Sequence, residues 1–213
     1  MTASAVVFDL FGTLVAVDDT SEPAAAVAAE LAARGVAVPD DWAAAYTEPH
    51  IDAPEGAEVP LPAHVAAALS SRGVDVAETT TRHAVIDAFE PTIETATGAV
   101  EAVAAASEAG PVGLLSNCAV PDLVGKTLRR SALDPTGFDA VVASVDCGWR
   151  KPDPRAFETV ADRLDVEAAD LVVIGDTPET DGGITAPGGE FIDTAETPLT
   201  DLPTRFTAEE PCR

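Results

Sequence analysis

The stretch "AVVFDLFGTLV", residues 5–15, decides the fold class because it joins an apolar strand to a single carboxylate and a glycine turn. The run Ala5–Leu10 shows no alternation of polar and apolar residues around Asp9, which is typical of a parallel strand covered on both faces. Burying a carboxylate is costly unless it is paired or binds a metal. The stretch therefore predicts a functional Asp9 whose partners come from elsewhere in the chain.

The composition indicates a folded protein with a carboxylate-rich surface. The chain has 213 residues, of which 46% are hydrophobic, and a net charge of −25. A disordered acidic chain would be poor in apolar residues. Such a surface suits a cytoplasm of high salt, where self-repulsion is screened. The charge and the lack of a basic patch argue against a nucleic-acid partner.

No basic, signal-like segment begins the sequence, and no run of 18 apolar residues predicts a membrane span. Cys118, Cys147 and Cys212 are widely spaced and form no metal-ligand pattern, so we interpret them as inert thiols. We expect a reduced, cytoplasmic protein without a membrane partner.

Residues 22–89 read as a helical zone. Prolines at the N-terminal end and glycines at the C-terminal end predict helices over 22–35 and 62–73, and a threonine cap predicts a helix over 79–89. A proline-rich loop, 47–62, lies between the first two. We interpret 16–93 as a helical cap domain inserted after the first strand.

From Thr95 the pattern alternates between helix and strand, which predicts an α/β fold, a doubly wound parallel sheet of the Rossmann-like type. With 1–15, residues 94–213 would form the core domain. The predicted helices are 97–110, 121–133 and 153–164, and the predicted strands are 111–117, 138–144, 170–176 and 190–194.

Polar side chains follow four of these strands, at the carboxyl edge where open parallel sheets bind ligands. We therefore expect one cluster at that edge. Its candidate members are Asp9, Ser116, Asn117, Arg150, Lys151, Asp176 and Asp181.

These segments resemble the haloacid dehalogenase-like (HAD) hydrolase superfamily over essentially the whole core. The matching stretches are "FDLFGTL" (8–14), "LLSN" (114–117), "KPDP" (151–154) and "GDTPETD" (175–181). The resemblance implies that Asp9 is the nucleophile and forms a covalent intermediate. It also implies that Ser116, with Asn117 beside it, contacts the transferring group, and that Lys151 neutralises developing charge.

The same resemblance implies a Mg²⁺ cofactor held by Asp9, Asp176 and Asp181, since carboxylate oxygens suit that ion. Asp181 could also begin the next short helix. The turn residues Phe11, Gly12 and Thr13 are expected to approach the substrate, with glycine allowing close contact.

The sequence departs from the phosphatase pattern at Phe11, where an aspartate usually acts as general acid–base. The haloacid dehalogenases carry tyrosine there, and a halide leaving group needs no proton. Those enzymes have serine at the position of Asp176 and use no metal. Two adjacent carboxyl groups, here Asp9 and Asp176, repel without a cation. Arg34 is the nearest candidate for their halide-binding arginine, but its surroundings differ.

Mg²⁺-dependent phosphoester hydrolysis is therefore the favoured interpretation, with 2-haloacid dehalogenation and non-catalytic binding of a phosphorylated ligand as alternatives. The expected partner is a small phosphorylated or halogenated metabolite. The loop 47–62 is either a specificity element or a connection. His50, His64 and His83 are the cap's candidates for proton transfer. The sequence does not decide the oligomeric state.

Overall fold

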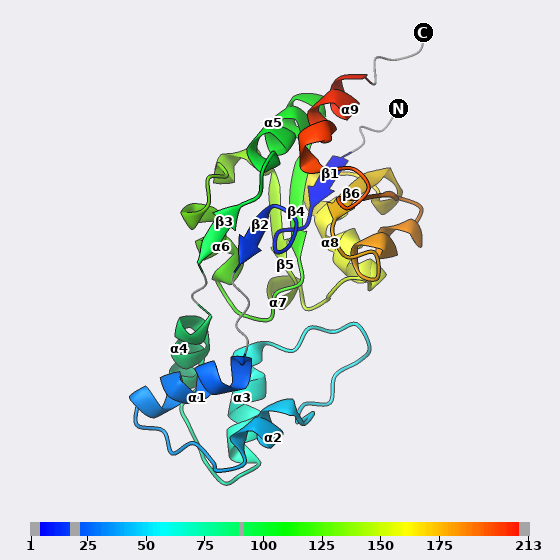
Figure 1. Ribbon diagram of the computed structural model, residues 1–213. Helices are drawn as coiled ribbons and strands as arrows, with labels where there is room; N and C mark the ends of the chain where they lie inside the picture. Colours follow the sequence, from blue (N-terminus) through cyan, green and yellow to red (C-terminus); the bar gives the residue numbers. More distant parts are fainter. Residues whose placement is uncertain (1–4, 18–21, 90–91, 209–213) are drawn as a thin grey trace.

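The computed structural model of the protein describes residues 5–17, 22–89 and 92–208. Its centre is a five-stranded sheet in the order β5-β4-β1-β6-β7. Every neighbouring pair in this sheet is parallel, which confirms the predicted α/β fold (Figure 1). The five strands are β1 (Ala5–Phe8), β4 (Val112–Ser116), β5 (Ala140–Ala143), β6 (Leu171–Gly175) and β7 (Glu190–Asp193).

Strand β1 lies in the middle of the sheet and is buried along its whole length. Val6 and Phe8 face one hydrophobic core, whereas Ala5 and Val7 face the other. Because both faces are covered, an uninterrupted apolar run is the sequence that such a strand requires. Helix α5 (Ala99–Ala109) and helix α6 (Leu123–Arg130) contribute to the first core, and helix α8 (Pro154–Leu164) contributes to the second.

Four helices, α1 to α4, lie together in a lobe beside the carboxyl edge of the sheet (Figure 1). Helix α4 packs against α1 and α3, with the buried residues Val27, Val65 and Val85 contributing one from each helix. Three of the helices confirm predictions made from sequence. The bounds are α1 (Pro23–Ala33), α2 (Trp42–Thr47), α3 (Leu61–Ser70) and α4 (Glu78–Ala88).

Several short elements were not predicted. Strands β2 (Val15–Val17) and β3 (Ile93–Thr95) form an antiparallel ribbon that brings the two ends of the insertion together. Helix α2 is anchored by Trp42, whose indole N–H donates to the Ala24 carbonyl at 2.8 Å. The predicted strand 138–144 ends one residue early because Ser144 begins helix α7. The remaining elements are α7 (Ser144–Cys147), α9 (Leu202–Ala208) and the 3₁₀ helices η1 (Pro135–Gly137), η2 (Ala168–Asp170), η3 (Asp181–Thr185) and η4 (Leu199–Asp201).

The helices of the three described segments are too short or too polar to cross a bilayer.

Candidate active site

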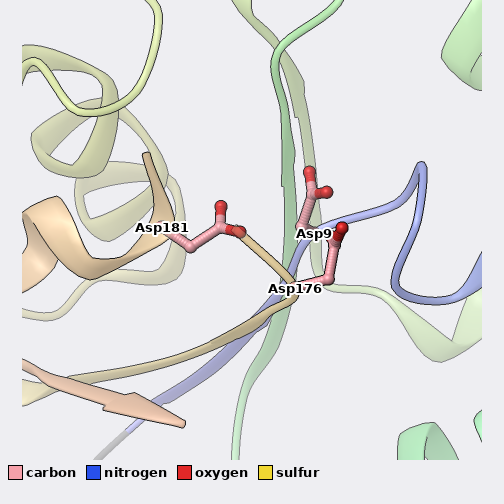
Figure 2. Close-up of side chains that lie close together, drawn as sticks. All are labelled: Asp9, Asp176 and Asp181. Atoms are coloured by element: carbon pink, nitrogen blue, oxygen red, sulfur yellow. The ribbon is translucent and has the colours of Figure 1, made fainter. Parts of the chain in front are cut away.

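Asp9 lies one residue beyond β1, at the carboxyl edge of the sheet (Figure 2). Its backbone N–H donates to the Ile174 carbonyl of β6 at 2.9 Å, so the turn begins while still held by the neighbouring strand. Only 8% of the residue is exposed. The aspartate in the opening stretch of sequence is therefore buried, and its partners must offset the cost of that burial.

Lys151 is the first of these partners. It is 2% exposed, and its ammonium group donates three hydrogen bonds. The acceptors are Asp9 Oδ1 at 2.8 Å, Asp181 Oδ1 at 2.5 Å and the Leu115 carbonyl at 2.8 Å. An ammonium group has three donors, and all three are used. Lys151 is thus a fixed internal cation between two buried carboxylates.

Asn117 holds the backbone of Lys151 in place. Its Oδ1 accepts from the Lys151 N–H at 2.8 Å, and its Nδ2 donates to the Lys151 carbonyl at 2.9 Å. Sequence analysis assigned Asn117 to substrate binding. In the structure its side-chain amide is engaged with the chain itself, which makes it a positioning group for the lysine.

Ser116, the last residue of β4, has a buried hydroxyl that the chain leaves without a partner. The residue is 1% exposed, and within the described residues its Oγ makes no hydrogen bond. Buried polar atoms are nearly always satisfied, so an unpaired one calls for an explanation. A ligand oxygen at the carboxyl edge of the sheet would supply the missing partner.

Asp9, Asp176 and Asp181 bring their carboxylates together: Asp9 follows β1, whereas Asp176 follows β6 and Asp181 begins η3 at the end of the same connection (Figure 2). One oxygen from each lies within 4.8 Å of the others. Asp9 and Asp181 are buried, whereas Asp176 is exposed. Sequence analysis proposed these three residues as metal ligands, and the structure places them side by side.

The turn after Asp9 supports the Asp176 carboxylate. Thr13 is 3% exposed, and its hydroxyl donates to Asp176 Oδ1 at 2.8 Å. Gly12 has φ +90, and a Cβ at this position would lie 2.5 Å from Asp176 Oδ2. Glycine is therefore required here by both conformation and space. Thr13, proposed as a substrate contact, is bound to Asp176 in this structure.

The electrostatics of the cluster act most strongly on the nucleophile candidate. Burial raises the pKa of the Asp9 carboxyl above its ordinary value, Lys151 counteracts this, and Asp181 adds to it. Desolvation favours the neutral acid, whereas a nearby cation favours the carboxylate. Any further positive charge placed among these carboxylates would favour the ionised form of Asp9.

Other candidates have defined surroundings away from this cluster. Phe11 is half-buried and packs against the hydrophobic core. Arg34 pairs with Glu30 and Asp87 within the insertion, which leaves it committed to two carboxylates. The Nε2 atoms of His50 and His64 each lie 2.7 Å from a backbone carbonyl oxygen. These two imidazoles are thus tied to the insertion's own backbone.

The two described cysteines lie in ordinary packing environments. Burial raises the pKa of the Cys118 thiol to about 11, so it is protonated at neutral pH. Cys147 is half-buried, and Cys212 lies outside the described residues.

Comparison with known proteins identifies the family. The sequence profile of the haloacid dehalogenase-like hydrolases matches residues 3–183. The chain belongs to the haloacid dehalogenase-like hydrolase family. Its members are hydrolases, so the expectation of a HAD-like enzyme is confirmed. A search of curated proteins found no match.

Several solved HAD structures share the fold. A 2-haloacid dehalogenase from Pseudomonas syringae pv. Tomato DC3000 has a TM-score of 0.68 and 20% identity, covering 96% of this chain and 98% of the other. CbbY from Rhodobacter sphaeroides, solved with phosphate, has a TM-score of 0.59 and 20% identity, covering 91% and 86%. A HAD family enzyme from Bacteroides thetaiotaomicron, solved with magnesium and inorganic phosphate, has a TM-score of 0.56 and 14% identity, covering 89% and 93%. At these identities the likeness shows the HAD fold alone.

Sequence reasoning missed the groups that support the site. The Leu115 carbonyl accepts from Lys151 Nζ, and the Thr177 N–H donates to Asp181 Oδ2 at 3.2 Å. Backbone groups leave no residue-type signal, so only the path of the chain reveals them. The role of Thr13 as a support for Asp176 could have been found from its place beside Gly12 in the same turn.

Proposed function

We propose that the chain is a Mg²⁺-dependent phosphohydrolase that acts on a small phosphorylated metabolite through a covalent aspartyl-phosphate on Asp9. The observation that carries this proposal is the position of Asp176, whose carboxylate joins those of Asp9 and Asp181 within 4.8 Å. Lys151 is hydrogen-bonded to the other two carboxylates but forms neither a hydrogen bond nor an ion pair with Asp176. Three carboxylates with one internal cation favour a further cation.

The donor set fits Mg²⁺. This ion takes six oxygen ligands at about 2.1 Å, so its ligands lie no more than about 4.2 Å apart. A spacing within 4.8 Å needs only a small contraction to reach that geometry. Because Asp176 is exposed, water and a substrate oxygen could complete the shell. When bound, Mg²⁺ would supply positive charge that offsets both the carboxylates and a phosphoryl group.

The proposed reaction has two steps. A carboxylate oxygen of Asp9 attacks phosphorus, and the bond to the leaving oxygen breaks with its electron pair, which gives the aspartyl-phosphate. Water then attacks the same phosphorus, loses a proton to solvent and releases inorganic phosphate with the Asp9 carboxylate restored. Lys151 holds Asp9 at 2.8 Å, and the unpaired Ser116 hydroxyl can donate to a phosphoryl oxygen.

The site differs from the usual phosphatase pattern in how the leaving group can receive a proton. Phe11 stands two residues after the nucleophile candidate and has no acidic proton to donate. The leaving oxygen would therefore depart as an anion or take its proton from water or from a group of the cap. Substrates with stable leaving groups would react faster, because general acid catalysis contributes about 10²–10⁴-fold where it is present.

Dehalogenation of a 2-haloacid is the second candidate, and Phe11 is the observation that favours it. In that reaction Asp9 would attack carbon, halide would depart without a proton, and water would hydrolyse the resulting ester. Asp176 argues against it, since a third carboxylate beside Asp9 and Asp181 would repel a carboxylate substrate in the absence of a cation.

The test is hydrolysis of p-nitrophenyl phosphate and of 2-chloropropionate, each with Mg²⁺ and with a chelator, in molar KCl. The proposal predicts release of phosphate that requires Mg²⁺ and no release of chloride. Chloride release that is indifferent to the chelator would favour dehalogenation. Phosphate binding without turnover of either compound would indicate a non-catalytic phospho-ligand protein.

We further propose that residues 1–15 and 94–213 act as the core and 16–93 as the cap. We place the protein in a cytoplasm of high salt. The helical lobe of Figure 1 and the net charge of −25 support these two proposals.

A further inference from the structure

The segment 56–58 of the insertion lies against the core rather than extending away from it. Ala57 pairs with Trp149 as an antiparallel bridge. The Glu58 N–H donates to the Gly148 carbonyl at 2.9 Å, and the Arg150 N–H donates to the Gly56 carbonyl at 3.0 Å. The segment therefore forms a short strand-like pairing with the residues that directly precede Lys151.

Glu58 adds a side-chain contact to a second part of the core. Its Oε2 accepts from the Ser144 hydroxyl at 2.6 Å, a length typical of a hydrogen bond to a charged carboxylate. Ser144 is fully buried, and its Oγ accepts from the Cys118 N–H at 2.8 Å. The Cys118 carbonyl in turn accepts from the Val145 N–H at 3.2 Å. Glu58 is thus linked through Ser144 to the backbone that follows Asn117.

Gly56 allows this close approach. Its φ is +79, and an added Cβ would overlap the side chain of Asp153, which begins helix α8. A residue other than glycine would be strained at this φ and would force either the segment or the Asp153 side chain to move. The docking is therefore specified by sequence at two positions, the glycine and the glutamate.

We propose that Glu58 is a positioning residue of the active site. The proposal rests on the function proposed above. The segment touches 148–150, which directly precedes Lys151, and it reaches 116–118, which carries Ser116 and Asn117, through the Ser144 hydroxyl. Asn117 already joins these stretches through both atoms of its amide. The side chain and backbone of Glu58, which belong to the insertion, hold the same two stretches in place. The loop 47–62 is then a structural part of the site.

The experiment compares Glu58→Ala, Glu58→Gln and a control, Asp52→Ala. Asp52 is an exposed acid of the same loop, so its removal changes the charge equally without touching the link. The first readout is kcat and KM for p-nitrophenyl phosphate with Mg²⁺ in molar KCl. The second is amide exchange at Cys118 and Arg150, whose N–H groups bond to Ser144 and to Gly56.

Glu58→Ala should lower kcat by about 10–100-fold, the usual effect of removing a group that orients site residues, and should change KM little. Glu58→Gln keeps an oxygen acceptor for Ser144 and should restore most of kcat. Exchange at Cys118 and Arg150 should quicken in Glu58→Ala only. Asp52→Ala should match the wild-type protein in both readouts.

An unchanged kcat in Glu58→Ala would overturn the proposal. A loss of kcat in Glu58→Gln as large as that in Glu58→Ala would also overturn it, because loss of the negative charge alone would then explain the lower kcat. If the wild-type protein hydrolyses nothing, the proposed function fails while amide exchange still decides the link. If Glu58→Ala does not fold, Ser144→Ala tests the same link from its other end, and unchanged exchange at Cys118 and Arg150 in a folded Ser144→Ala protein would overturn it.

Discussion

Replacing Lys151 by methionine tests the internal cation of the site. Methionine keeps most of the length and volume of lysine but removes the charge, which leaves Asp9 and Asp181 buried without their shared partner. Lys151 is 2% exposed and donates to both carboxylates, at 2.8 and 2.5 Å. Removing one member of a buried ion pair costs about 3–5 kcal/mol. For a protein of this size, such a loss lowers Tm by roughly 6–20 °C.

The assay is urea unfolding at constant molar KCl with a chelator present, so that salt and metal are fixed. The chain offers a matched control, since Lys126 and Lys151 are its only lysines. Lys126 lies half-buried on α6 and has no ion pair with any residue in the described part of the chain. Lys126→Met should change the free energy of unfolding by no more than about 0.5 kcal/mol.

The destabilisation caused by Lys151→Met should depend on pH in a definite direction. Asp9 has a pKa above its ordinary value in the folded protein, and loss of Lys151 removes the charge that counteracts this. A group with a raised folded pKa favours the folded state at pH values below its unfolded pKa, and that stability is lost as pH rises through the folded pKa. The destabilisation of Lys151→Met should therefore be largest near neutral pH and shrink on acidification. A variant as stable as Lys126→Met, or a loss independent of pH, would refute the reasoning.

Phe11→Asp should raise the turnover of phosphate esters with poor leaving groups by up to about 10²–10⁴-fold and should change the turnover of p-nitrophenyl phosphate little. A folded, Mg²⁺-binding variant without that contrast would show that proton transfer was not limiting. Ser116→Ala should lower kcat by about 10²–10³-fold without loss of stability, because its hydroxyl has no partner among the described residues. A large fall in Tm would instead indicate a structural role. The Tm of the protein should rise between dilute buffer and molar KCl, because salt screens the repulsion within a chain of charge −25. An unchanged Tm would contradict a high-salt adaptation.

Much of the core could be predicted from sequence because its signals are local. The strands β1, β4, β5 and β6 are apolar runs bounded by turn residues, and these four and the shorter, more polar β7 were each found within about two residues of their observed ends. Parallel sheets bring the ends of such strands to one edge, so the meeting of Asp9 with Asp176 followed from topology.

The parts that sequence missed depend on distant partners. The ribbon of β2 and β3 pairs Val15 with Thr95, and neither three-residue strand has a pattern of its own. The docking of 56–58 on the core joins Ala57 to Trp149 through backbone groups. Asn117 and Thr13 were recognised as members of the site, but their contacts with Lys151 and Asp176 required coordinates.

The central claim is that Asp9 takes up a phosphoryl group when Mg²⁺ is present. The direct measurement is mass spectrometry of acid-quenched protein after incubation with p-nitrophenyl phosphate, with peptides mapped to locate any adduct. The account predicts one added phosphoryl group on the peptide that contains Asp9, absent with a chelator and absent in Asp9→Asn. Phosphate release that persists in Asp9→Asn, with no adduct on the wild-type peptide, would contradict it.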